Sequence, residues 1–127
     1  MVVSLTRHQS GGDAVEATGP VDGLVVDISK LGQNWEFVLH VLFLTPGKRA
    51  LFQVQTSEDN FASVLPGPTF NPSGEVKSTA PRKFVAKGSD FPSLPFGKAG
   101  AKLRLSLAAV DPETNVRYSA FVRMLES

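Results

Sequence analysis

The side chains that could carry out chemistry in this 127-residue chain are few and far apart. The two histidines, His8 and His40, are too distant in sequence to form a neighbouring pair of metal ligands. His40 could act as the base for a serine nucleophile, but neither Ser57 nor Ser106 lies in a Gly-x-Ser-x-Gly turn. We therefore predict no catalytic residues, and we expect His40 to be an ordinary residue on the face of a strand.

Metal and cofactor sites have equally little support in the sequence. Residues 58–60, Glu-Asp-Asn, place oxygen-bearing side chains in a row, and calcium prefers such ligands. The same residue types also close turns through local hydrogen bonds, which is the simpler interpretation of this segment. The chain has no cysteine, and no glycine-rich segment links a strand to a helix in the way that a phosphate cradle requires. We expect no metal and no cofactor.

Trp35 and Tyr118 are the only residues of their types in the chain. Rings of this kind, when exposed, could stack on sugars, so a carbohydrate-binding β-sandwich module is the alternative function. Both residues fall on strand faces that alternate toward a core, which favours core packing over sugar binding. A buried Tyr118 would need a hydrogen-bond partner for its hydroxyl group.

The charge balance gives no long-range attraction to a polyanion. There are 13 basic and 12 acidic residues, so nucleic acid and anionic membranes are not expected partners. The longest apolar run, residues 37–44, is too short for a membrane span, and the first residues lack the apolar core of a signal peptide. Basic side chains gather in the C-terminal half, where we expect a solvated outer face that could also meet an acidic protein surface: Lys83, Lys87, Lys98, Lys102, Arg104, Arg117 and Arg123.

Short strands and turns must position these residues, because 11 glycines and 9 prolines leave no window for an uninterrupted amphipathic helix. Alternation with a period of two predicts a strand over residues 35–43. Its inward face would carry Trp35, Phe37, Leu39, Val41 and Phe43. Pro46 and Gly47 suit a type II turn, which predicts a hairpin whose return strand, residues 50–55, directs Ala50, Phe52 and Val54 inward.

A second hairpin closes the chain, with strands over residues 101–109 and 116–125 around a turn at residues 111–115. The first of these strands would direct Ala101, Leu103, Leu105, Leu107 and Ala109 inward. Shorter strands are expected at 24–28, 75–78 and 83–87, with long loops between residues 66 and 100. Seven to eight strands with short spacings predict an all-β, antiparallel, jelly-roll-like β-sandwich over residues 21–127. Residues 1–20 would form an extended N-terminal arm, with room for one short strand at 14–18.

This pattern resembles a family of virion proteins. The residues that carry the resemblance are the long aromatic strand with its Pro-Gly hairpin, residues 52–61, residues 90–97 and the strand from Ala101 to Leu105. Over residues 22–124 the chain is similar to the small β-sandwich virion proteins of tailed bacteriophages, including capsid decoration (cement) proteins. The resemblance implies a non-enzymatic structural protein, made in the host cytoplasm, that binds the outer surface of the capsid and stabilises it.

The resemblance also implies the partners of the chain. They would be the major capsid protein or another virion protein, together with further copies of the chain in a trimer or dimer. An extended arm could order on a neighbouring subunit, which points to Val2, Val3, Leu5, Arg7 and His8 as partner-binding residues. A terminus without such a role is the alternative for the arm, and an enzyme is the third hypothesis for the whole chain.

Overall fold

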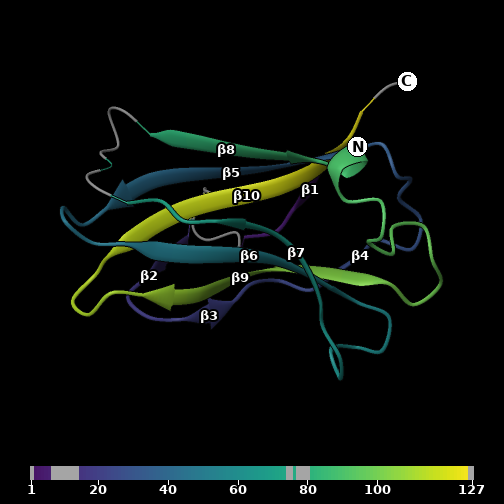
Figure 1. The fold of residues 1–127 in the computed structure, drawn as a ribbon, viewed down its shortest axis with the longest axis horizontal. Coiled ribbons are helices and arrows are strands. Elements are labelled where there is room, and N and C mark those ends of the chain that lie inside the picture. The colour runs from purple at the N-terminus through teal and green to yellow at the C-terminus, as the bar shows by residue number, and fades with distance from the viewer. Residues whose placement is uncertain (1, 7–14, 74–75, 77–80, 126–127) are drawn as a thin grey trace.

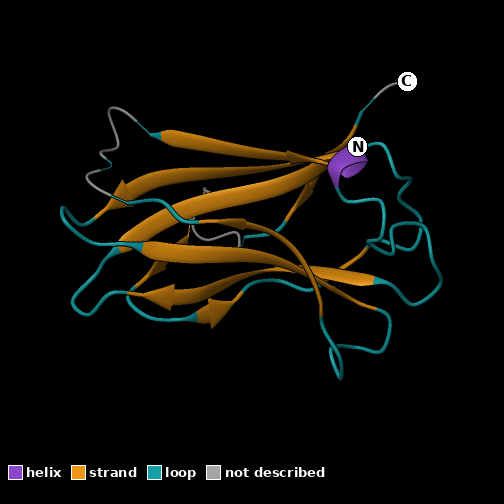
Figure 2. Cartoon of the chain, in the orientation of Figure 1, coloured by secondary structure: helices purple, strands orange, loops and turns teal. Residues whose placement is uncertain are grey.

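The computed structural model describes residues 2–6, 15–73, 76 and 81–125, and it consists of two antiparallel sheets packed face to face (Figure 1). Each sheet has five strands, so the described residues contain ten strands instead of the seven to eight expected. A single 3-10 turn, η1 (Gly88–Asp90), accompanies them in these segments (Figure 2). The predicted all-β antiparallel sandwich is confirmed. Within the same segments, no helix has the length and apolar character that a bilayer span requires.

The first sheet contains the two ends of the described chain and the long aromatic strand. Its strands are β1 (Val2–Ser4), β2 (Val15–Ala17), β5 (Trp35–Leu44), β8 (Arg82–Lys87) and β10 (Val116–Met124). Their order is β1-β10-β5-β8, and β2 also pairs with β10. The long strand β10 therefore holds both N-terminal strands on one side and β5 on the other.

The second sheet is built around the remaining long strands. Its strands are β3 (Val21–Asp22), β4 (Val26–Asp27), β6 (Ala50–Ser57), β7 (Leu65–Phe70) and β9 (Lys102–Val110). Their order is β3-β9-β6-β7, and β4 also pairs with β9. The short strands β3 and β4 therefore form one edge of this sheet, and β7 forms the other.

The core lies between the sheets and follows the predicted alternation along the long strands. Trp35, Phe37, Leu39 and Val41 of β5 are fully buried, and so are the inward residues Phe52 and Val54 of β6. The Trp35 ring stacks on Phe96, with 4.6 Å between the ring centroids. Full burial of a side chain of this size contributes about 1.5–3 kcal/mol relative to exposure, so these alternating faces supply much of the driving force for folding.

Two inward assignments are wrong because β-bulges interrupt the alternation. Phe43 is 36 % exposed, since the pairing of β5 with β10 shifts register next to Tyr118 and the following residue, Leu44, turns inward. Ala109 is also exposed, because the pairing of β6 with β9 shifts between Leu51 and Phe52. A bulge inserts one extra residue into a strand and so exchanges the two faces beyond it.

The predicted turn between the first two long strands is confirmed. The backbone N–H of Lys48 donates to the carbonyl oxygen of Thr45 at 3.2 Å, and Gly47 has a φ of 78°. A positive φ at the third residue of a turn is the mark of type II geometry, and glycine adopts it without a steric penalty.

The expected arm over residues 1–20 is corrected by the structure, because its described residues belong to the first sheet. β1 and β2 both pair with β10, and the N–H of Leu5 donates to the carbonyl oxygen of Ala120 at 2.9 Å. Leu5 is 0 % exposed and lies in the core. The proposed boundary between residues 20 and 21 therefore does not separate an arm from the sandwich. β2 falls within the short strand expected at 14–18, whereas β1 was not anticipated, because a strand of three residues is too short to show a period in the sequence.

Three shorter segments also differ from expectation. Residues 65–70 form β7 although Pro66 and Pro68 predicted a loop, because β7 is an edge strand and has a single neighbour to hydrogen-bond. The strand expected at 24–28 is instead the pair β3 and β4, joined by three residues without ladder pairing. The strand expected at 75–78 falls mainly outside the described residues. Of this segment the structure describes Val76, which forms an isolated bridge to Leu44.

Candidate functional site

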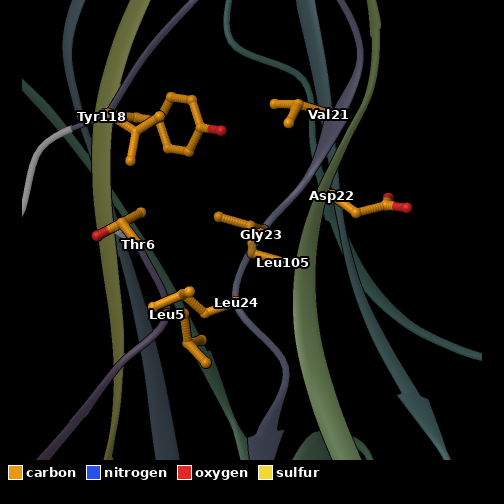
Figure 3. A pocket seen from close by; sticks show the side chains of 9 residues that line it. Leu5, Thr6, Val21, Asp22, Gly23, Leu24, Leu105 and Tyr118 are labelled. Atoms are coloured by element: carbon orange, nitrogen blue, oxygen red, sulfur yellow. The ribbon is translucent and has the colours of Figure 1, made fainter. Parts of the chain in front are cut away.

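The two sheets enclose a partly open hollow of about 330 Å³ at one edge of the sandwich. One wall comes from the side of the first sheet and includes Leu5, Thr6, Val15 of β2 and the Tyr118 side chain of β10 (Figure 3). The facing wall comes from the second sheet and consists of residues 21–24 and Leu105 of β9. Residues from the N-terminal part and the C-terminal part of the sequence therefore meet around one space.

Gly23 lets the chain approach both sheets closely at this hollow. Its N–H donates to the carbonyl oxygen of Leu105 at 2.8 Å. A Cβ atom at this position would lie 2.9 Å from the oxygen of Leu105 and 3.0 Å from the oxygen of Leu5. The first contact is shorter than a Cβ atom tolerates, the second is tighter than most, and both are with backbone atoms. A residue without a Cβ is therefore what keeps the segment 21–24 in place as a wall of the hollow.

Tyr118 is the main polar group of the inner wall. It is 3 % exposed, and its ring meets Phe52 edge-on with 4.8 Å between centroids. The hydroxyl oxygen points into the hollow, and no described residue forms a hydrogen bond with it (Figure 3). Burial raises the pKa of Tyr118 to about 12, so the hydroxyl keeps its proton at neutral pH. The expectation that Tyr118 packs in the core is confirmed, but the hydrogen-bond partner expected for its hydroxyl is not found.

The one carboxylate among the described lining residues, that of Asp22, turns away from the hollow. The Asp22 carboxylate accepts a hydrogen bond from the Ser106 hydroxyl at 2.9 Å and lies 3.5 Å from a guanidinium nitrogen of Arg104. Figure 3 shows this side chain on the far side of its strand. The described lining of the hollow is therefore electrically neutral.

Exposed apolar side chains lie along the strand edge beside the hollow. We call residues 21–27 the β3–β4 edge. Val21, Leu24 and Val25 are 42 %, 38 % and 50 % exposed. Grouped apolar side chains at a surface are a common mark of a contact with another molecule, whereas single ones are ordinary. The β3–β4 edge is therefore the candidate contact surface of the described chain.

The structure describes three of the five residues predicted to bind a partner, and these three have different surroundings. Val2 and Val3 lie in β1, paired with β10, and Leu5 is buried in the core. Leu5 is therefore corrected to a core residue, because a partner could reach it only if this edge of the sandwich opened. Arg7 and His8 lie outside the described residues.

His40 is half-buried on the outer face of the first sheet, away from the hollow. It lies opposite Ser119 and Lys83 on the neighbouring strands, and its ring centroid is 6.2 Å from that of Phe121. Ser57 and Ser106 belong to the second sheet. His40 therefore lies on a strand face, as expected, and both serines lie on strands of the other sheet.

The acidic segment at residues 58–60 forms a self-contained turn. The Asp59 carboxylate accepts hydrogen bonds from the Ser57 hydroxyl at 2.6 Å and from the N–H of Ser63 at 2.9 Å. These bonds, with a further one from the Ser63 hydroxyl, lower the pKa of Asp59 to about 2. In the part of the chain that the structure describes, no group of three or more histidine or acidic side chains is arranged to hold a metal ion.

The basic residues do not form the single face that the sequence suggested. Lys83, Lys87 and Arg123 lie on strands of the first sheet, whereas Lys102 and Arg104 lie in β9 of the second. Lys102 is 3.6 Å from the Asp27 carboxylate, just as Arg104 is close to Asp22. The charges of β9 are therefore partly neutralised by acids of the β3–β4 edge.

Sequence reasoning missed the hollow, although one signal pointed toward it. Gly23 is an isolated glycine within an apolar, strand-like segment, a pattern that often marks a close backbone approach. Nothing in the sequence pairs that glycine with Leu5, Leu105 or Tyr118. Comparison with protein-family models, curated sequences and solved structures gives no match for this chain.

Proposed function

We propose that the chain is a non-enzymatic structural protein of a tailed-bacteriophage virion, where it decorates the outer capsid surface and stabilises it by protein–protein contacts. The observation that carries the proposal is the β3–β4 edge, where Val21, Leu24 and Val25 leave a large part of their apolar surface in solvent. Covering such side chains on binding removes apolar area from water, at about 25 cal/mol for each Å². The resemblance of residues 22–124 to decoration proteins implies the major capsid protein or another virion protein as the partner.

The shape of the edge supports a protein partner more than a sugar. Among the described strands, β3 and β4 pair with β9 alone, so the other side of this edge is open to another polypeptide. Trp35 and Tyr118, the rings that a carbohydrate-binding module would use, are buried at 0 % and 3 % exposure. Carbohydrate binding would need another aromatic platform.

The proposal is tested by mixing the purified chain with capsid shells of the phage that encodes it and measuring co-sedimentation. The informative variant is Val25→Asp, which places a charge in the proposed contact. Its matched control is Val85→Asp, at a residue of similar exposure, 42 %, on β8 of the other sheet. We expect Val25→Asp to weaken binding at least tenfold, because burial of an unpaired charge costs more than about 1.4 kcal/mol, and Val85→Asp to bind like the unaltered chain.

Two results would count against the proposal in different ways. If the unaltered chain does not sediment with the capsids, the proposed function is wrong. If it binds and both variants bind equally well, the function stands but the β3–β4 edge is not the contact. Light scattering on the free chain tests the trimer or dimer that the resemblance implies.

A further inference from the structure

The hollow has the features of a binding site for a small molecule, independently of the proposed function. A cavity of 150 Å³ in another protein's core can hold benzene. The hollow measures about 330 Å³, which lies at the lower end of the range for ligand pockets. It has room for one ring and a short substituent.

The walls of the hollow are fixed by the fold. The Tyr118 ring is held by its edge-on contact with Phe52, and β10 beneath it pairs with strands on both sides. On the facing wall, the hydrogen bond from Gly23 to Leu105 anchors the segment 21–24 to β9. A ligand would therefore meet a site that is already formed, which lowers the entropic cost of binding.

The hydroxyl of Tyr118 selects the chemistry of the ligand. It is the polar end of a side chain more than nine-tenths buried, it points into the hollow, and it has no partner in the described residues (Figure 3). The hollow is partly open to solvent, so a ligand that accepts the proton of this hydroxyl replaces a hydrogen bond to water and gains the net free energy of one hydrogen bond.

The charge of the described lining does not favour ions as ligands. Asp22 is turned away and is neutralised by Arg104, so neither a cation nor an anion finds a counter-charge in the described lining. A charged ligand would lose its hydration without compensation. We propose that the hollow binds an uncharged molecule of about one ring that accepts a hydrogen bond from the Tyr118 hydroxyl.

Three fragments of similar size separate the contributions to binding. Acetophenone has a ring and a neutral acceptor, ethylbenzene has the ring alone, and benzoate has the ring and a negative charge. Each is titrated into the ¹⁵N-labelled chain while the amide signals of Gly23, Leu105 and Tyr118 are followed by NMR. We expect acetophenone to shift these signals and to bind about two- to tenfold more tightly than ethylbenzene, the factor that a net hydrogen bond supplies. Benzoate should bind most weakly.

The variant Tyr118→Phe removes one oxygen atom and keeps the ring against Phe52. In this variant, acetophenone and ethylbenzene should bind with equal affinity. The comparison of the two fragments on the unaltered chain needs no variant, so it stands even if Tyr118→Phe is unstable. The proposal is overturned if no fragment shifts the three amides, if benzoate binds as well as acetophenone, or if Tyr118→Phe keeps the preference for acetophenone. None of these results depends on capsid binding.

Discussion

The backbone of Gly88 lies directly against the indole of Trp35, so closely that no side chain fits between them. A Cβ atom on Gly88 would lie 2.7 Å from Trp35 Nε1 and 2.1 Å from the carbonyl oxygen of Gln33. Trp35 is fully buried, and its Nε1 has no hydrogen-bond partner among the residues that the structure describes. The glycine at the start of η1 is therefore a packing requirement of the largest core side chain.

Replacement of this glycine should destabilise the fold. We expect Gly88→Ala to lower the free energy of unfolding by about 1–3 kcal/mol, the usual cost of forcing extra atoms into a packed core. Urea unfolding followed by the fluorescence of Trp35, the single tryptophan, measures this change. Gly19→Ala is the control, since nothing lies within 4 Å of a Cβ there. Equal urea midpoints for the two variants would contradict the packing requirement.

The position of Leu5 in the core gives a second prediction. Leu5→Ala should lower the free energy of unfolding by about 2–5 kcal/mol, because it removes a fully buried side chain. Leu24→Ala, at a residue 38 % exposed, should cost far less. If Leu5→Ala proves as mild as Leu24→Ala, residues 2–5 do not contribute to the core in solution, and the arm interpretation returns.

The turn glycine Gly47 provides a test of backbone conformation alone. Its φ is 78° and nothing lies within 4 Å of a Cβ placed there, so a side chain would be strained without any clash. We expect Gly47→Ala to cost about 1–2 kcal/mol in thermal or urea unfolding. Gly47→Asn should cost less, because asparagine tolerates left-handed conformations better than alanine does. Indistinguishable alanine and asparagine variants would show that the turn changes conformation to relieve the strain.

The turn around Asp59 should make stability depend on pH in acid. The folded pKa of about 2 is below the ordinary value of 3.8, so the unfolded chain binds a proton at this carboxyl more readily than the folded chain. The stabilisation is therefore complete above about pH 4 and is lost as the pH falls toward 2. Asp59→Asn should remove this pH dependence. The difference in the free energy of unfolding between the variant and the unaltered chain should therefore shrink as the pH falls from about 4 toward 2. NMR titration of the carboxyl carbon gives the pKa directly, and a midpoint near 3.8 would contradict the prediction.

The long strands could be predicted because each carries its own pattern. Trp35, Phe37, Leu39 and Val41 alternate without interruption, and burial of one face is enough to fix such a strand. Phe43 was misplaced because a bulge depends on the partner strand, which the local pattern does not contain. The edge strand β7 was missed because proline is compatible with a strand only when one side is unpaired, and that is a property of the whole sheet.

The hollow could not be predicted, because no stretch of sequence contains it. Its walls include Leu5, Gly23, Leu105 and Tyr118. The sequence predicted an inward direction for Leu105 and Tyr118, but not for Leu5 or Gly23. Alternation shows that Leu105 and Tyr118 point toward a core, but it does not reveal that the space between them stays unfilled. That space depends on how the β3–β4 edge lies against β1, which is decided by pairing with β9 and β10.

The central place of β10 in its sheet has a consequence for how the protein forms during synthesis. β1, β2 and β5 all pair with β10, which follows every other strand in sequence. While the ribosome is still translating the chain, Leu5 and the aromatic face of β5 have no completed sheet to join. The first sheet closes only after residues 116–124 have left the exit tunnel, and until then the nascent chain depends on its solubility or on chaperones to avoid aggregation.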